Sequence, residues 1–197
     1  VVRGLGVIKI KHMDRVFLKN KELIGSKYFL KPFVEANISE EYIRWLNDPK
    51  VNSYLEVRHE KQTNKSVKNY INSFYDVSEK YIWGIYVIDK KKHIGTVNIS
   101  IDRYNSAEIG LMIGDKSYWG KLASDEAIKM VVDFAFKTLK INRITGGTYA
   151  ENIGMIFTFK SLGFRREAVL KESVIGRNGK YSDIYRWAIL AHEWRNK

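Results

Sequence analysis

Alternating apolar and polar positions predict seven strands along the chain. Such alternation places successive side chains on opposite faces of a sheet. The polar segments Asp89–Lys92 and Arg103–Ser106 are typical of hairpin turns, and Gly176–Gly179 joins the last two strands in the same way. Pro32 favours an edge position for the first strand, because proline donates no ladder hydrogen bond. The predicted strands span residues 28–33, 81–88, 93–101, 107–113, 143–148, 165–175 and 181–190.

Apolar residues spaced three and four positions apart predict four helices. The first helix ends at Asn47-Asp48-Pro49, because proline disfavours helical geometry in the residue before it. Gly163 suits the left-handed residue that often follows the last turn of a helix. The longest helix carries an apolar stripe of Ala127, Met130, Val131, Phe134, Ala135 and Leu139. The predicted helices span residues 38–46, 65–76, 122–139 and 152–162.

The order of these elements, βααβββαβαββ, predicts a single α/β (α+β) domain. Its mixed central sheet has about seven strands and is flanked by about four helices. No linker-like stretch divides the chain, so we assign residues 28–190 to this domain, residues 1–27 to an N-terminal extension and residues 191–197 to a C-terminal tail. His12-Met13 is typical of a cloning junction, which leaves open whether residues 1–12 are vector-derived or natural.

The composition excludes several classes of protein. With 45% hydrophobic and 13% aromatic residues among 197, the chain can bury a substantial core. It contains no cysteine, which excludes disulfides, thiolate metal sites and a cysteine nucleophile, and its lone histidines lack metal-ligand spacing. No apolar run reaches the ~18–20 residues that cross a bilayer, and no apolar core of signal-peptide length is present. We therefore expect a cytoplasmic protein without a metal or a membrane partner.

The net charge of +12 predicts attraction to anions. Nucleic acid, a phosphorylated cofactor and a nucleotide-linked substrate are anionic partners, and a merely solvated surface is the remaining alternative. The excess charge is not packed into one tract, and no nucleic-acid-binding motif accompanies it. Nucleic acid is therefore the least favoured of these partners.

Residues 107–127 contain the most informative pattern in the chain. A predicted strand runs into a polar loop with Gly114 and Gly120, and a long helix follows. Free amide groups and the dipole at a helix N-terminus form an anion site, and Lys116 and Lys121 add positive charge. The pattern predicts a phosphate-binding turn, although plain connections of this type are common. The GxxxxGK[ST] pattern of a P-loop is absent.

The same stretch resembles the acetyl-CoA-binding motif of the GCN5-related N-acetyltransferase (GNAT) superfamily. The likeness is to its ribosomal-protein N-terminal acetyltransferase (RimJ/RimL)-like branch, whose loop reads like YWGKG(Y/L)A(T/S)EA. The segments FLKPF at 29–33, WLNDP at 45–49 and ENIGMIFTFKSLGF at 151–164 are also similar to this branch. The matching positions are Tyr118, Trp119, Gly120, Lys121, Glu126, Ala127, Glu151, Asn152, Leu162, Gly163 and Phe164.

The sequence departs from the family pattern at several positions. Leu122 stands where the motif has a glycine, and that glycine normally lets the loop backbone approach the pyrophosphate. The final small residue of the motif is Ser124 in this sequence. Met155 replaces the usual serine or alanine. Phe159 stands where many members have a tyrosine that protonates the leaving thiolate. These departures bear on the strength of cofactor binding and on the identity of the acid.

The resemblance implies acetyl-CoA as co-substrate and a set of residues that bind it. The backbone at Met112 and Ile113 would pair with the pantetheine arm. Asn152 would contact the cofactor further along, although it could simply cap its helix. The pyrophosphate would be held by Trp119, Gly120, Lys121, Leu122, Ala123 and Ser124.

Amine acetylation needs a base that accepts the amine proton, and carboxylates are the candidates. Glu108 is the first choice, because AEIG resembles the strand where some family members place this base; the alternative is a solvated strand residue. Glu56 is the second, and its alternative is a salt bridge with Arg58. Tyr149 and Glu151 lie where the strands would open, yet could be rim residues.

The leading hypothesis is an N-acetyltransferase that moves the acetyl group of acetyl-CoA directly to a primary amine. A nucleotide-linked amino sugar and a peptide or protein N-terminus are the favoured acceptors, since a positive surface repels polyamines and aminoglycosides. A non-catalytic acyl-CoA-binding regulatory domain is the alternative, motivated by Leu122 and Phe159. The oligomeric state stays open, a homodimer included.

Overall fold

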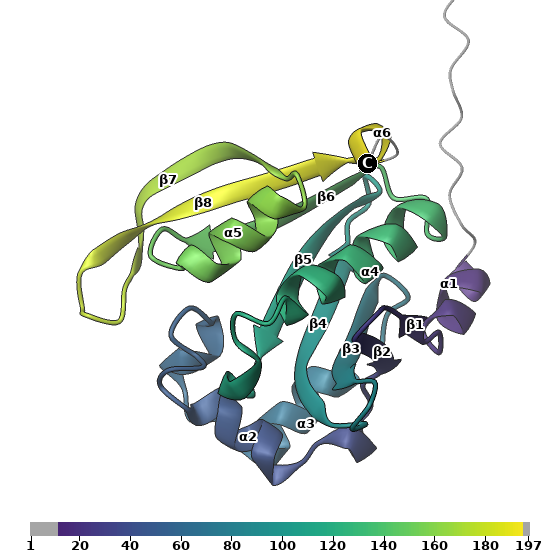
Figure 1. Ribbon diagram of the computed structural model, residues 1–197, viewed down its shortest axis with the longest axis horizontal. Coiled ribbons are helices and arrows are strands. Elements are labelled where there is room, and N and C mark those ends of the chain that lie inside the picture. The colour runs from purple at the N-terminus through teal and green to yellow at the C-terminus, as the bar shows by residue number, and fades with distance from the viewer. Residues whose placement is uncertain (1–11, 195–197) are drawn as a thin grey trace, which may run out of the picture.

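A computed structural model describes residues 12–194 and shows a single mixed sheet of eight strands flanked by helices (Figure 1). The strand order is β1-β2-β3-β4-β5-β6-β8-β7. The strands are β1 Leu23–Ile24, β2 Tyr28–Pro32, β3 Lys80–Val87, β4 His93–Ile101, β5 Ser106–Ile113, β6 Arg143–Tyr149, β7 Arg165–Ile175 and β8 Tyr181–Leu190.

All seven predicted strands are confirmed, and β1 is the additional one. Two residues are too few for alternation to reveal, so β1 exists only because it pairs with β2 through Leu23↔Leu30 and Ile24↔Phe29. Beyond Leu30, no described strand pairs with the edge of β2 that faces β1. Pro32 lies in this unpaired stretch, and because proline has no N–H, no backbone donor is left without a partner there.

The four predicted helices are confirmed as α2 to α5, each somewhat shorter than predicted. Short 3-10 turns were not predicted. Side-chain caps explain several helix starts: Ser39 accepts from the Tyr42 amide and Thr63 from the Ser66 amide. The α-helices are α1 His12–Leu18, α2 Glu40–Asn47, α3 Asn64–Asn72, α4 Ala123–Lys137, α5 Ile153–Ser161 and α6 Ala191–Trp194; the 3-10 turns are η1 Glu35–Asn37, η2 Glu56–His59 and η3 Lys116–Tyr118.

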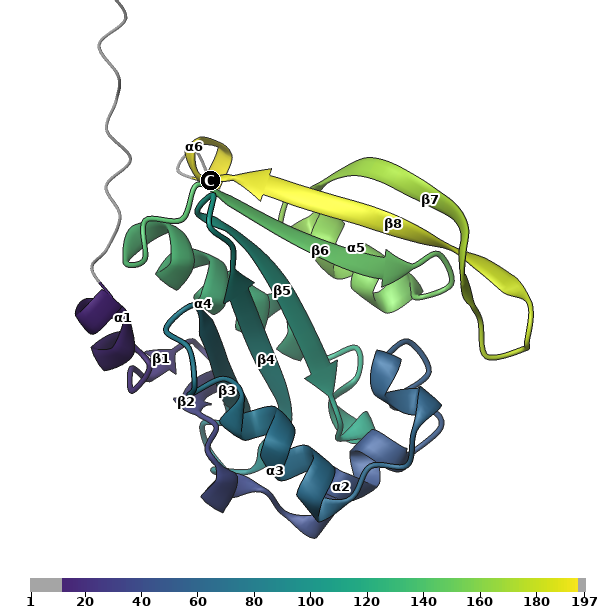
Figure 2. The ribbon, with the colours of Figure 1, turned by 180° about the vertical axis from the view of Figure 1, so that it is seen from behind.

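Two hydrophobic clusters lie on opposite faces of the sheet. On β3, Trp83 packs into the cluster that contains α4, while its neighbour Ile82 packs with α2 and α3. Figure 2 shows α3 in front of the sheet, the side opposite to α4. Among the described residues, no helix is long and apolar enough to cross a membrane.

Residues 12–24 pack against the domain. The Tyr81 hydroxyl donates to the Arg15 carbonyl at 3.1 Å, and the Trp83 indole donates to the Lys21 carbonyl at 3.0 Å. Lys19 donates to the carbonyls of Phe74 and Val77 just beyond α3. The predictions for residues 1–11 and 195–197 lie outside the described residues.

Candidate active site

The β5–β6 opening is the feature that positions the site. These strands are parallel and pair only from Ser106↔Arg143 to Glu108↔Thr145, although β5 continues to Ile113 and β6 to Tyr149. The two arrows separate beyond that point in Figure 1. Every other neighbouring pair in the sheet is antiparallel. The opening therefore exposes polar backbone of β5 that no strand covers.

Backbone alternation shows which residues of β5 face the opening. The Gly114 amide donates to the Ile94 carbonyl of β4 at 2.8 Å, so the Ile113 carbonyl points the opposite way. The Trp119 indole N–H donates to that carbonyl at 2.9 Å. By the same alternation Leu111 offers its backbone groups to the opening, whereas the Met112 backbone faces β4. Met112 therefore reaches the site through its side chain.

The β5–α4 loop, residues 114–122, ends in two left-handed residues. Gly120 has φ +72°, and a Cβ built on it would meet no atom within 4 Å. Leu122 has φ +60° and ψ 16°, and its side chain is 65% exposed. Leucine thus occupies the conformation that glycine favours, at a cost of about 1–2 kcal/mol. The substitution strains the loop but keeps the backbone path of a glycine.

The first turn of α4 presents unsatisfied donors next to this loop. The backbone amides of Gly120 and of residues 122–125 have no acceptor within the described part of the chain. Leu122, at the N-cap, supplies no side-chain acceptor. With the helix dipole, these amides offer donors suited to an anion, at the place where the sequence predicts a phosphate-binding turn around Ala123 and Ser124.

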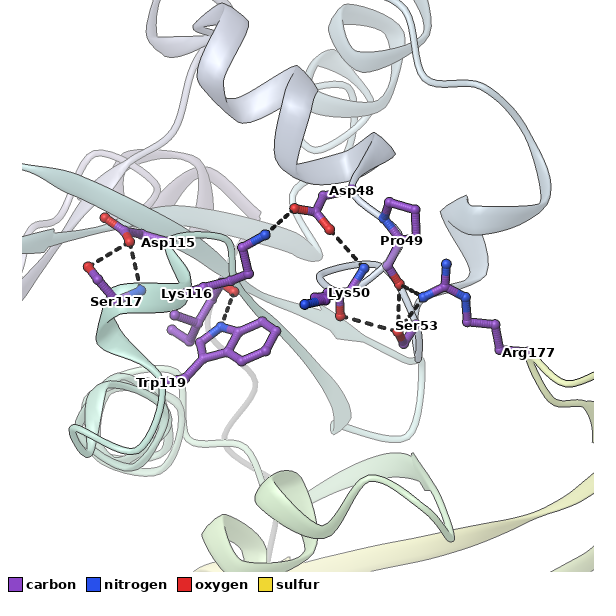
Figure 3. A network of polar contacts seen from close by, with 10 residues as sticks. Asp48, Pro49, Lys50, Ser53, Asp115, Lys116, Ser117, Trp119 and Arg177 are labelled. Carbon is purple, nitrogen blue, oxygen red and sulfur yellow. Dashed lines mark hydrogen bonds and ion pairs between the residues drawn. The ribbon is translucent and has the colours of Figure 1, made fainter.

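The two lysines of the loop differ in their surroundings. Lys116 forms an ion pair with Asp48, and this hydrogen bond holds the pKa of Asp48 below its usual value (Figure 3). Lys121 forms no ion pair with any described residue, and its Nζ lies 5.2 Å from the centroid of the Tyr118 ring. Lys121 is therefore the unneutralised cation beside the free amides.

Glu126, a matching position of the resemblance, has a structural role here. Its Oε1 accepts hydrogen bonds from the backbone amides of Lys27 at 2.8 Å and Tyr28 at 3.2 Å, and from Ser26 as well. The Tyr28 hydroxyl donates to the Lys121 carbonyl at 3.1 Å. These contacts fasten the start of α4 to the turn between β1 and β2.

A cavity of about 640 Å³ adjoins the β5–β6 opening. Its walls include residues 108–112 of β5 and 147–149 of β6, together with η2 and parts of α2, α3, β4, β7 and β8. Both predicted base candidates, Glu108 and Glu56, line it. The structure thus brings together two carboxylates that lie far apart in the sequence.

The two carboxylates have different partners. Glu108 accepts a hydrogen bond from Nη1 of Arg186 on β8 at 2.8 Å. Glu56 accepts one from the Tyr149 hydroxyl at 3.0 Å through Oε1, and the His59 Nε2 lies 3.7 Å from its Oε2. The salt bridge between Glu56 and Arg58 considered from the sequence does not form. Arg58 instead donates to the Tyr149 hydroxyl at 2.8 Å.

Sequence reasoning missed the roles of Arg58 and Arg186. Neither belongs to a recognisable motif, and Arg186 meets Glu108 only because β6 lies between β5 and β8. The sequence offered a single hint of the second role, namely that Arg186 occupies an alternating position on the last predicted strand. Within residues 12–194, no cluster of three or more histidine, aspartate or glutamate side chains is arranged as a metal site.

Asn152 and Phe159 both have structural contacts. Asn152 is the N-cap of α5, and its Oδ1 accepts from the Met155 amide at 3.2 Å, which leaves its NH₂ group available. Phe159 is 1% exposed and stacks on Trp187 with ring centroids 5.9 Å apart. Its ring does not line the cavity.

Comparisons with known proteins agree on one family. The protein-family model described as "Acetyltransferase (GNAT) domain" matches residues 28–165. The chain is 27% identical over 166 residues to the uncharacterized N-acetyltransferase p20 of Bacillus licheniformis, covering 82% of this chain and 92% of that protein. It is 36% identical over 115 residues to the protein named "Probable N-acetyltransferase YjcK" of Bacillus subtilis, covering 57% and 62%.

Solved structures of the same kind share the fold. A GNAT-family acetyltransferase from Bacillus anthracis superposes with a TM-score of 0.74 at 21% identity, covering 88% of this chain and all of that one. A spermidine N-acetyltransferase from Vibrio cholerae, solved with CoA and spermine, superposes with a TM-score of 0.73 at 22% sequence identity. The match covers 87% of this chain and 100% of that one. A ribosomal-protein-S5-alanine acetyltransferase from Vibrio fischeri superposes with a TM-score of 0.72 at 19% sequence identity. The match covers 88% of this chain and 98% of that one.

Proposed function

The chain belongs to the acetyltransferase (GNAT) domain family, and we propose that it transfers the acetyl group of acetyl-CoA directly to a primary amine. The observation that carries this proposal is the β5–β6 opening, which has free amides at one end and a cavity with two carboxylates beside it. A donor bound along β5 would direct its thioester towards that cavity.

The residues present fit a CoA pyrophosphate. Five unsatisfied amides, the open space beside Gly120 and the unpaired Lys121 supply the charge and room that a phosphate group needs. The backbone groups of Leu111 and the Ile113 amide face the opening and suit hydrogen bonds to the amide groups of a pantetheine arm, while the Ile113 carbonyl already accepts from Trp119. Leu122 does not prevent this fit, because it already follows the backbone path of a glycine.

Direct transfer is the chemistry that the chain can support. It has no cysteine to form a cysteinyl acyl-enzyme. The acceptor ammonium must first lose a proton, and either cavity carboxylate could accept it. The amine nitrogen then forms a bond to the thioester carbonyl carbon, the carbon–sulfur bond breaks, and the sulfur leaves as a thiolate that takes up a proton.

For the acceptor we favour a nucleotide-linked amino sugar or the N-terminus of a peptide or protein. The net charge of +12 supports an acceptor that carries negative charge and disfavours a polyamine. The resemblance to the RimJ/RimL-like branch supports a peptide amine. The likenesses to an acetyltransferase named for an alanine of ribosomal protein S5 and to a spermidine acetyltransferase both rest on fold alone.

Thermal unfolding with acetyl-CoA, followed by thiol release across an amine panel, tests this function. Acetyl-CoA at a hundredfold excess over its Kd should stabilise the native state by about 2.7 kcal/mol. The panel contains a UDP-linked amino sugar, short peptides with free N-termini, and spermidine. No stabilisation would contradict the proposal, and binding without thiol release would favour a regulatory acyl-CoA-binding domain.

A further inference from the structure

Tyr149 and Glu56, which line the cavity, form a connected group with Arg58. The Tyr149 hydroxyl, on the last residue of β6, accepts a hydrogen bond from Nη2 of Arg58 at 2.8 Å. The same hydroxyl donates to Oε1 of Glu56 on η2 at 3.0 Å. Arginine has only donors, so Arg58 fixes the direction of the hydroxyl hydrogen towards Glu56.

Arg58 is itself held in place by other contacts. Its Nη1 donates to the Ser53 carbonyl at 2.7 Å, and its Nη2 also donates to the Ile175 carbonyl of β7 at 2.6 Å. Its guanidinium carbon lies 4.9 Å from the centroid of the Tyr149 ring, within cation–π distance. The guanidinium therefore orients the phenol and does not neutralise Glu56 in a salt bridge.

The Tyr149 hydroxyl is well suited to donate a hydrogen bond to Glu56. Tyr149 is 5% exposed, and burial together with the hydrogen bond to Glu56 raises its pKa above the ordinary value. The phenol therefore keeps its proton at neutral pH. Because β5 and β6 have separated before this residue, its position faces the β5–β6 opening as well as the cavity.

Glu108 faces a different constraint. Its carboxylate pairs with the guanidinium of Arg186, which remains charged at any pH a protein tolerates. To accept a proton, Glu108 would have to weaken that pair. Glu56 forms no salt bridge with a lysine or arginine among the described residues, and its contacts are the Tyr149 hydroxyl and the His59 imidazole. The carboxylate that is held by a neutral donor is the one free to accept a proton.

We propose that Glu56 accepts the proton of the acceptor ammonium, and that Tyr149, fixed by Arg58, is the positioning residue that holds the Glu56 carboxylate towards the cavity. This inference rests on the proposed function. The ammonium N–H bond breaks and its proton joins a Glu56 carboxylate oxygen, which leaves the nitrogen lone pair free to attack. Tyr149 keeps its own proton throughout. Glu108 with Arg186 shapes the cavity wall and takes no proton.

Steady-state kinetics with the most active amine of the panel test this assignment. Glu56→Gln should lower kcat roughly 10²–10⁴-fold, as expected for loss of a general base, with an unchanged Kd for acetyl-CoA. Tyr149→Phe, which removes only the hydroxyl, should lower kcat about tenfold, also without weakening acetyl-CoA. Glu108→Gln should lower kcat by less than about tenfold, as expected for a wall residue.

The double variant Tyr149→Phe/Glu56→Gln separates positioning from mere stability. If Tyr149 acts through Glu56, the double variant should be no slower than Glu56→Gln alone. Tyr75→Phe is the matched control, because it removes a phenol that donates to the Phe33 carbonyl at 3.2 Å away from the cavity, and it should keep wild-type kcat.

Losses that multiply in the double variant would overturn the inference, as would a Tyr149→Phe variant with wild-type kcat. So would a Glu108→Gln loss as large as that of Glu56→Gln. A wild-type chain that binds acetyl-CoA and acetylates no amine would instead overturn the proposed function, and this inference with it. Turnover by the wild type together with an equally active Glu56→Gln variant would overturn the inference alone.

Discussion

Lys116 of the β5–α4 loop forms an ion pair with Asp48, the residue that directly follows α2 (Figure 3). On the other side of the same segment, Arg177 of the β7–β8 turn donates to the Pro49 carbonyl and to Ser53 Oγ. The segment after α2 is thereby tied to the loop that would bind the cofactor and to the hairpin beside the cavity. Lys116 therefore does not contribute its full charge to the proposed anion site.

Asp48→Asn should release Lys116 towards the anion site. We expect CoA binding to tighten about two- to fivefold at low salt, and the free energy of unfolding to fall by less than about 1 kcal/mol, because exposed ion pairs contribute little. Isothermal titration calorimetry measures the first effect and urea unfolding the second. Asp133→Asn removes the same charge near the end of α4, where it pairs with Lys129 and Lys137, and should leave CoA binding unchanged. Equal tightening in both variants would mean that net charge alone is responsible.

The left-handed conformation of Leu122 leads to a second prediction. Leu122→Gly should raise the free energy of unfolding by about 1 kcal/mol, because glycine adopts φ +60° without a Cβ clash and an exposed leucine loses few contacts. CoA affinity should change little, since the backbone path is already that of a glycine. Urea unfolding with Leu122→Ala as control decides the point: alanine retains Cβ and should gain nothing, so an equal gain in both variants would refute the strain.

Gly120 allows a test of the anion site that separates charge from backbone strain. Asparagine and aspartate both tolerate positive φ, and neither would meet a neighbouring atom near its Cβ. Gly120→Asp should weaken CoA binding about five- to tenfold more than Gly120→Asn, because the carboxylate repels the pyrophosphate. The difference should shrink in 0.5 M salt, which screens exposed charges. Equal affinities in the two variants would show that no phosphate lies at this turn.

The β5–α4 loop could be predicted from the sequence because its parts are local. A strand end, two glycines and the first turn of a helix follow one another within residues 107–127, and backbone groups supply the donors of the proposed anion site. Even so, glycine is required at the two positions for different reasons. Gly120 needs its positive φ, whereas a Cβ on Gly114 would lie 2.2 Å from the Trp45 ring of α2, a contact that only the fold creates.

The cavity could not be predicted in the same way. Glu108 and Arg186 are 78 positions apart, and Glu56 and Tyr149 are 93 apart, so their pairing depends on strand order and on where η2 lies. The alternation of the last strand predicts that Arg186 and Trp187 face opposite sides, but it does not say which side faces Glu108. Strand β1 escaped prediction for a related reason, since pairing with β2 alone makes it a strand.

Phe159→Tyr should not restore an acid for the leaving thiolate. A Cβ on Gly146 would lie 2.4 Å from Cζ of Phe159, so a hydroxyl at that carbon would press on β6. We expect a loss of about 1–3 kcal/mol in the free energy of unfolding from overpacking, and no increase in kcat. Phe157→Tyr is the control, because that ring is 68% exposed and its hydroxyl would reach water. A stable Phe159→Tyr variant with faster turnover would contradict this prediction.

His93 leads to a prediction about pH. Its ring lies against the rings of Phe33, Tyr42, Trp45 and Tyr86, and its Nε2 lies 2.8 Å from the Gly95 carbonyl. Burial lowers the pKa of His93 from 6.5 to about 4. Because the folded-state pKa is the lower one, its contribution to stability is complete above pH 6.5 and is lost as the pH falls towards 4.

A shift of this size corresponds to roughly 3 kcal/mol between neutral pH and pH 4. NMR titration of the imidazole protons should place the His93 midpoint near pH 4. Urea unfolding should show His93→Gln losing less stability than the wild type between pH 7 and pH 4, because the variant has no imidazole to protonate. A His93 midpoint near 6.5 would mean that water reaches this ring, and the packing of α2 against β4 would then be looser than these contacts imply.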